Sequence, residues 1–174
     1  MNSDNARIIT VVSGLPRSGT SLMMQMLDAA GLPILQDGQR KADAGNPHGY
    51  YEFEKVKALA RDASWIGQAQ GKAVKIVSLL LSSLPGEHEY RIIFMTRRME
   101  EILASQAAML ERLGQKPRGP SDADMARHYE RHLAKLDAWL KSQANMRILY
   151  CSYNALIETP APILRDLCVF LGMA

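Results

Sequence analysis

The sequence predicts a three-layer α/β/α fold with a central, mainly parallel sheet. Short apolar runs with strand character alternate along the chain with longer stretches of helical periodicity, and helices that join parallel strands cover both faces of a sheet. A glycine-rich loop joins the first apolar run to the first helical stretch. The chain has 174 residues, of which 47% are hydrophobic. We therefore expect residues 1–174 to form a single compact domain.

The first strand is expected near residues 7–13, which are mostly apolar. Residues 14–21 follow with the sequence Gly-Leu-Pro-Arg-Ser-Gly-Thr-Ser. Residues 22–30 then carry apolar side chains at helical spacing, and Gly31 and Pro33 end the predicted helix. This order of strand, glycine loop and helix is the order of a phosphate-binding P-loop.

Three more strands are expected, near residues 72–77, 91–96 and 147–152. Helical periodicity predicts helices over residues 52–67 and 100–113. A third helix is predicted to begin at Ser121, because Ser121 and Asp124 have the spacing of a capping box.

The glycine loop has the composition of an anion-binding site. Its backbone N–H groups can form a concave nest, and the positive end of the following helix points at the same place. The lysine of the nucleotide-hydrolysing pattern is absent, since Thr20 occupies its position and the basic residue is Arg17. The residues expected to hold the anion are Gly14, Pro16, Arg17, Ser18, Gly19, Thr20 and Ser21.

The strand predicted at residues 91–96 ends in a basic pair, Arg97 and Arg98. Proteins that hydrolyse ATP or GTP at a P-loop usually hold Mg²⁺ with an aspartate at such a strand end. The missing lysine and aspartate count against a nonclassical P-loop kinase, which stays as an alternative, and we expect no metal in the site.

Two motifs together resemble those of sulfotransferases that use 3′-phosphoadenosine 5′-phosphosulfate (PAPS). They are the glycine loop and Arg97 followed eight positions later by Ser105. The resemblance implies that the loop holds the 5′-phosphosulfate and that Arg97 and Ser105 hold the 3′-phosphate. The Pro-Arg variant of the loop is most similar to the tyrosylprotein sulfotransferase branch and to compact bacterial relatives. Residues 147–172 resemble the closing strand, tyrosine-containing turn and helix of the family.

The resemblance implies an enzyme that transfers a sulfuryl group from PAPS to a hydroxyl acceptor. Arg17 and the loop amides would stabilise the bridging oxygen as its bond to sulfur breaks. Lys75 is similar to the lysine after the family's second strand, although a surface lysine beside a strand explains it equally well. A sulfotransferase-like module that binds a nucleotide or a partner without catalysis is a second alternative.

The general base stays open at this stage. Many cytosolic members place a histidine two positions beyond the lysine, where this chain has Val77. The tyrosylprotein branch uses a glutamate roughly twenty residues beyond the loop arginine, and that count arrives at Asp37. Residues 33–54 form an irregular, polar segment of the kind that often builds an active site. Within it Glu52 is as good a candidate as Asp37, and His48 is a third.

Composition limits the partners. A net charge of +3 gives no support to a nucleic-acid partner. No apolar run approaches the roughly 20 residues of a membrane span, and the first residues lack the pattern of a signal peptide, so we expect a cytoplasmic protein. Cys151 and Cys168 have no metal-ligand spacing and are expected to be buried free thiols.

The sequence ends two residues after Gly172, where many sulfotransferases continue into a segment that covers the adenosine. We expect this domain to lack that cover, to receive it from another subunit or to be a truncated form. The class of the acceptor and the oligomeric state are not predicted.

Overall fold

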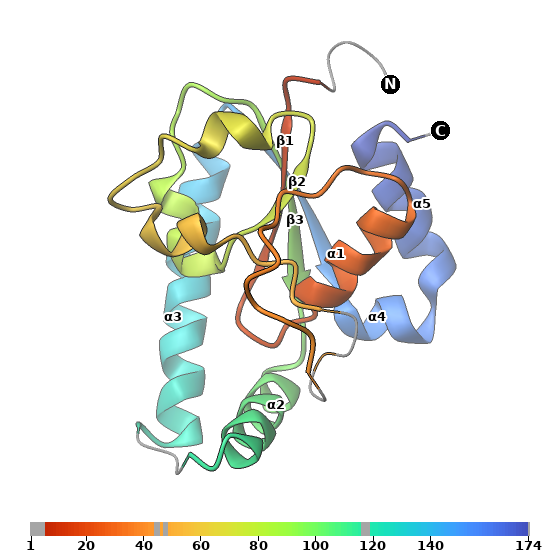
Figure 1. Cartoon of the computed structure of the whole chain (residues 1–174). Helices are drawn as coiled ribbons and strands as arrows, with labels where there is room; N and C mark the ends of the chain where they lie inside the picture. The colour runs from red at the N-terminus through yellow and green to blue at the C-terminus, as the bar shows by residue number, and fades with distance from the viewer. Residues whose placement is uncertain (1–5, 44–45, 47–48, 116–118, 174) are drawn as a thin grey trace.

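A parallel four-stranded sheet forms the centre of the computed structural model, which describes residues 6–43, 46, 49–115 and 119–173. The strands are β1 (Ile9–Gly14), β2 (Ala73–Lys75), β3 (Tyr90–Thr96) and β4 (Met146–Ser152). Their spatial order is β2-β1-β3-β4 (Figure 1), and all three pairings are parallel. All four predicted strands are confirmed, and their carboxyl ends lie at one edge of the sheet.

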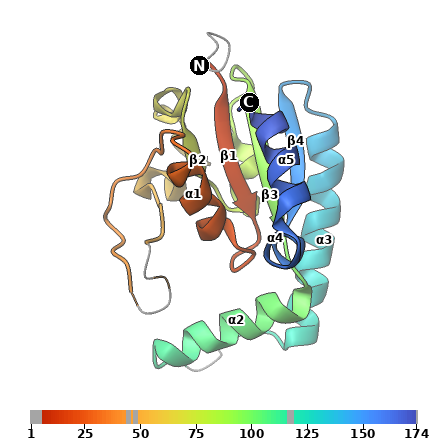
Figure 2. The ribbon, with the colours of Figure 1, turned by 90° about the vertical axis from the view of Figure 1, so that its right-hand side faces the viewer.

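Helices cover both faces of the sheet. Figure 2 looks onto the face covered by α1 (Thr20–Ala29), α4 (Tyr153–Glu158) and α5 (Pro160–Leu171), with α3 (Asp122–Lys141) behind the sheet. Alternate side chains of β3 enter the two separate cores, as expected for a strand buried on both sides. The three-layer α/β fold predicted from the sequence is confirmed.

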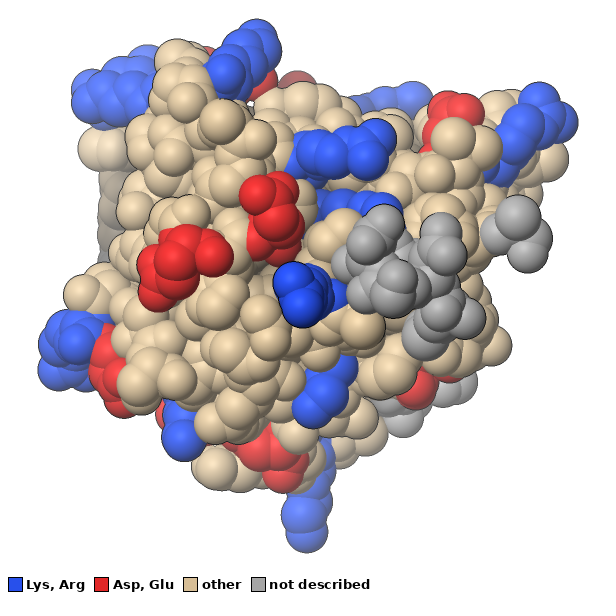
Figure 3. All heavy atoms as spheres, turned by 90° about the horizontal axis from the view of Figure 1, so that it is seen from above, with Lys and Arg blue, Asp and Glu red and all other residues tan. Residues whose placement is uncertain are grey.

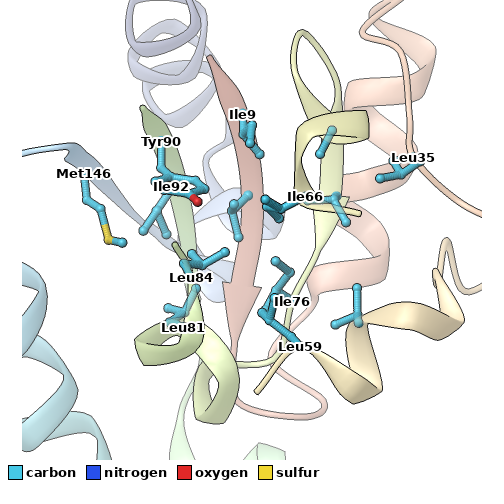
Figure 4. Close-up of a cluster of buried hydrophobic side chains, with 14 of the residues drawn as sticks. Ile9, Leu35, Leu59, Ile66, Ile76, Leu81, Leu84, Tyr90, Ile92 and Met146 are labelled. Carbon is cyan, nitrogen blue, oxygen red and sulfur yellow. The ribbon is translucent and has the colours of Figure 1, made fainter. Parts of the chain in front are cut away.

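The core on the α3 side contains the larger cluster of buried aliphatic side chains, including Ile9, Ile66, Ile76, Leu81 and Ile92 (Figure 4). Several of these side chains come from short 3₁₀ segments. These segments connect successive strands along the chain and pack on this face of the sheet. Burial of each such side chain contributes about 1.5–3 kcal/mol of transfer free energy. This packing gives the functional edge of the sheet a rigid support.

The helix predicted over residues 52–67 is wrong. That stretch contains the 3₁₀ segment η1 (Glu54–Ala58), followed by turns that lead into a second segment, η2 (Ile66–Ala69). Val56 and Leu59 are buried three positions apart, and this spacing suits a 3₁₀ turn as well as one face of an α-helix. The apolar periodicity was therefore real, but it did not distinguish the two helix types.

The other two helix predictions are confirmed. Helix α2 (Met99–Arg112) lies across the carboxyl edge of the sheet and extends beyond it (Figure 2). Helix α3 begins directly after Ser121, whose side chain accepts a hydrogen bond of 3.2 Å from the backbone N–H of Asp124. A last 3₁₀ segment, η3 (Ser78–Ser83), connects β2 to β3.

Cysteine burial follows the prediction for one residue only. Cys151 is buried, and burial raises the pKa of its thiol to about 11. Cys168 is exposed on α5, so the prediction of a buried thiol there is wrong. None of the helices in the described part of the chain is long and apolar enough to cross a membrane.

Candidate functional site at the carboxyl edge of the sheet

The glycine loop, residues Gly14–Ser21, turns tightly between β1 and α1. A Cβ atom added to Gly14 would lie 2.4 Å from the hydroxyl of Ser18 and 2.6 Å from the backbone carbonyl of Met95. A side chain at Gly19, where φ is +99°, would lie 2.5 Å from the ring of Tyr153. Glycine is therefore required at both positions, because the backbone is approached closely and Gly19 is left-handed.

One loop residue other than glycine is also left-handed, since Arg17 has a φ of +71°. Such backbone geometry in a larger residue is held by its surroundings and concentrates at functional sites. The Ser18 hydroxyl is buried and has no hydrogen-bond partner among the described residues. An orphaned hydroxyl beneath a turn of amide groups suits a site that takes an anionic ligand.

The end of β3 and the start of α2 meet this loop. Arg97 donates from Nη1 to the backbone carbonyl of Arg17 at 3.2 Å, and Arg17 donates from Nε to the hydroxyl of Ser105 at 2.9 Å. The two motifs that the sequence separates by about eighty residues therefore lie side by side. Both arginines line the same pocket, and the serine is bound to one of them, Arg17.

Two further groups hold the Arg97 side chain. Its Nε donates to a carboxylate oxygen of Glu101 at 2.8 Å, and its guanidinium lies 4.3 Å from the centre of the Tyr153 ring. The Tyr153 ring is thus packed between Arg97 and the backbone of Gly19. A cation over an aromatic face is stabilised by the ring quadrupole, so Tyr153 couples the strand-end arginine to the loop.

Lys75 and Glu52 also line the pocket. The Lys75 side chain is only 10% exposed, and its Nζ lies 3.4 Å from Oε1 of Glu52. It also donates to the backbone carbonyl of Tyr50. Burial lowers the pKa of Lys75, and the neighbouring Glu52 carboxylate partly opposes that shift. The surface-lysine reading does not fit this burial.

The pocket between these groups has a volume of about 350 Å³. Its lining contains most of the residues predicted for the site, namely Pro16, Arg17, Gly19, Thr20, Ser21, Glu52, Lys75 and Arg97. Gly14 and Ser18 lie in the turn beneath it, and Ser105 reaches it through Arg17. The lining also contains residues that the sequence did not single out, including Gln25, Arg40, Asn46, Tyr50 and Tyr153.

Two of the three candidate bases lie in the described part of the chain. Glu52 lines the pocket, whereas Asp37 is not among its lining residues. His48 lies outside the described residues.

Asp37 instead forms hydrogen bonds within the irregular segment that contains Glu52. Its carboxylate accepts hydrogen bonds from the backbone N–H groups of Glu54 at 2.6 Å and Gln39 at 3.0 Å. Its own N–H donates to the carbonyl of Glu52 at 3.2 Å. The bond from Glu54 is the main reason why the pKa of Asp37 is lowered. Asp37 thus holds the backbone at Glu52 and at Glu54.

The face at the other edge of the sheet carries charges of both signs (Figure 3). Figure 3 views the molecule from the amino ends of the strands and shows acidic and basic side chains scattered among neutral ones over the described part of that face.

Comparison with known proteins assigns the family. The model of the sulfotransferase domain matches residues 8–174, which is nearly the whole chain. A search of curated proteins found no significant match. The family match covers the glycine loop, the end of β3 and the closing strand and helices. Taken with the three-layer fold and the pocket at the carboxyl edge of its sheet, it shows that this protein is a member of the sulfotransferase family.

Proposed function

We propose that this protein transfers a sulfuryl group from PAPS to a hydroxyl acceptor. The observation that carries the proposal is the contact of Arg97 and Ser105 with the glycine loop through Arg17. This contact supports a single ligand with anionic groups at two positions. The glycine loop provides one set of hydrogen-bond donors, and Arg97 with Ser105 provides a second set close to it.

The donor would be held by the two halves of the site. The loop amides and the amino end of α1 would bind the 5′-phosphosulfate, helped by the hydroxyls of Thr20 and Ser21. Arg97 and Ser105 would bind the 3′-phosphate, since a guanidinium and a hydroxyl are suitable donors to phosphate oxygens.

The chemical step would be an in-line displacement at sulfur. The acceptor hydroxyl gives its proton to Glu52 as its oxygen forms a bond to sulfur. The bond from sulfur to the bridging oxygen breaks, and its electron pair stays on the phosphate of the leaving nucleotide. Arg17 and Lys75 both line the pocket and would stabilise the negative charge that develops on the bridging oxygen.

Glu52 is our choice among the candidate bases because it lies in the pocket next to Lys75. Asp37 would position Glu52 through the backbone and would not accept the proton itself. This assignment predicts that Glu52→Gln abolishes turnover while donor binding is retained.

A thermal-shift experiment tests the donor site. Adenosine 3′,5′-bisphosphate should raise the melting temperature, and the rise should disappear in Arg97→Ala. ATP with Mg²⁺ should stabilise the protein less. Preference for ATP with Mg²⁺ would support a kinase and contradict the proposal.

Turnover is tested separately, with radiolabelled PAPS and a panel of sugars, phenols, alcohols and tyrosine peptides. Transfer to at least one hydroxyl acceptor is expected. Binding of the bisphosphate without transfer to any acceptor would indicate a binding module without catalysis.

A further inference from the structure

Arg40 is the outermost cation of the pocket and contacts the proposed base directly. Its Nη1 lies 2.8 Å from Oε1 of Glu52, and its guanidinium lies 3.5 Å from the centre of the Tyr50 ring. We infer that Arg40 is a positioning residue that fixes the Glu52 carboxylate for proton transfer. This inference rests on the proposed function.

The two oxygens of Glu52 have different surroundings. Oε1 is shared by Arg40 at 2.8 Å and Lys75 at 3.4 Å, so cations hold it from two sides. Oε2 has no hydrogen-bond or ion-pair partner among the residues that the structure describes. A carboxylate held at one oxygen presents the other in a defined direction. Oε2 is therefore the oxygen available to the acceptor hydroxyl.

Arg40 is itself held in place by the Tyr50 ring, which is fixed by contacts of its own. The Tyr50 side chain is buried, and its hydroxyl donates to the carboxylate of Asp43, which lies 2.8 Å away at both oxygens. Lys75 binds the backbone carbonyl of the same tyrosine. The Tyr50 ring is thus anchored at both ends, and the guanidinium can lie flat on it while it donates to Glu52.

Stability alone does not explain this arrangement. The Arg40 side chain is 47% exposed, and a half-exposed ion pair contributes little to folding because water screens it. Removal of Arg40 should therefore leave the protein folded and the donor site intact, while the direction of the Glu52 carboxylate becomes less defined. A group that is misplaced by about 1 Å can lower the rate of a reaction roughly a hundredfold.

Lysine would be an incomplete substitute for Arg40. A guanidinium can stack on a ring through its plane and donate from its edge at the same time, whereas an ammonium is a point charge on a flexible stem. We expect Arg40→Lys to fall between the wild type and Arg40→Ala. Free guanidinium ion should fill the place of the missing group in Arg40→Ala, because that variant leaves both Tyr50 and Glu52 available.

The experiment measures kcat, the KM for PAPS, the binding of adenosine 3′,5′-bisphosphate and the melting temperature for four proteins. They are the wild type, Arg40→Ala, Arg40→Lys and Arg61→Ala, an exposed arginine outside the pocket lining. In Arg40→Ala we expect kcat to fall about 10- to 100-fold, with the KM for PAPS and bisphosphate binding within about twofold of wild type. Millimolar guanidinium should raise kcat of Arg40→Ala and leave Glu52→Gln inactive.

Different results would contradict different claims. An active wild type with an equally active Arg40→Ala overturns the role of Arg40 and leaves the proposed function intact. Loss of bisphosphate binding or of folding in both Arg40 variants also overturns it, because Arg40 would then be structural. Failure of guanidinium to raise kcat excludes direct positioning through the guanidinium. A wild type that transfers no sulfuryl group removes the proposed function, and the role of Arg40 with it.

Discussion

Arg17 and Ser105 are joined by a hydrogen bond of 2.9 Å, although they are 88 positions apart in the sequence. The bond links the residue that faces the sulfuryl group in our proposal to one that faces the 3′-phosphate. The Ser105 hydroxyl accepts from Arg17, so it can donate its own proton to a 3′-phosphate at the same time. We therefore expect the two halves of the donor site to depend on each other.

Ser105→Ala tests that dependence. The variant loses one hydroxyl donor to phosphate, and we expect it to weaken binding of adenosine 3′,5′-bisphosphate about tenfold, or about 1.4 kcal/mol. Binding of adenosine 5′-monophosphate, which has no 3′-phosphate, should change much less. Isothermal titration calorimetry with both ligands measures the difference. Equal losses for the two ligands would show that Ser105 acts only through the structure of the loop.

Gly19→Ala should destabilise the protein by about 2–3 kcal/mol, because it adds both backbone strain and a clash with the Tyr153 ring. The matched control is Gly38→Ala. Gly38 also has a positive φ, of +66°, but an added Cβ would meet no described atom within 4 Å. We expect this control to cost only about 1 kcal/mol. Urea unfolding of both variants measures the difference, and similar losses would mean that the ring moves away without cost.

Asp37→Asn should reduce kcat roughly tenfold by loosening the backbone around Glu52, with little change in bisphosphate binding. Steady-state kinetics and calorimetry distinguish the two effects. An inactive Asp37→Asn beside an active Glu52→Gln would instead identify Asp37 as the base.

The order of the segment from Asp37 to Glu54 should also depend on pH. The pKa of Asp37 is lowered from 3.8 in the folded protein, so the carboxylate stabilises the fold above that value. This stabilisation is lost as the pH falls through the folded-state pKa, which lies below 3.8. Amide exchange protection at Glu54, whose N–H binds Asp37, should fall in acid in the wild type, and it should already be low near neutral pH in Asp37→Ala.

His132 should make folding stability depend on pH near neutrality. Its Nε2 lies 3.0 Å from the hydroxyl of the buried Ser78, and burial lowers its pKa from 6.5. The unfolded chain then binds a proton at a higher pH than the folded protein. Stability from this group is complete above about pH 6.5 and decreases as the pH falls toward the folded-state pKa.

Urea unfolding between pH 7.5 and 5.5 should show a smaller decrease in stability for His132→Gln than for the wild type. His128→Gln is the control, because His128 lies on the same helix but is exposed. If both variants reduce the pH dependence equally, burial of His132 is not its cause.

Local sequence was sufficient for the main elements of the fold. Strand composition placed all four strands, and the Ser121 cap placed the start of α3. The structure of residues 52–67 was harder to predict. The spacing of Val56 and Leu59 fits both an α-helix and a 3₁₀ helix. The turns of this stretch are stabilised by tertiary contacts such as the packing of Phe53 against Trp65, whose ring centres are 5.2 Å apart.

The site was predictable where a short motif carries it. The glycine loop and the irregular segment that contains Glu52 were predicted from residue types and spacing, and Arg97 and Ser105 were predicted from the family resemblance. Arg40, Tyr50 and Tyr153 were missed as individual residues. Each acquires its place only through a contact that forms on folding, and a single arginine or tyrosine carries no local pattern.

By itself, the sequence determined that this protein has alternating strands and helices, a glycine loop built for an anion and a basic motif at the end of one strand. These features depend on backbone preferences and side-chain periodicity, which act over a few residues. Only the tertiary structure decided that Glu52 lies in the pocket and that Asp37 forms hydrogen bonds to the backbone of Glu52 and Glu54. Both carboxylates occur in the same irregular segment, and only folding onto the sheet brings one of them beside Lys75.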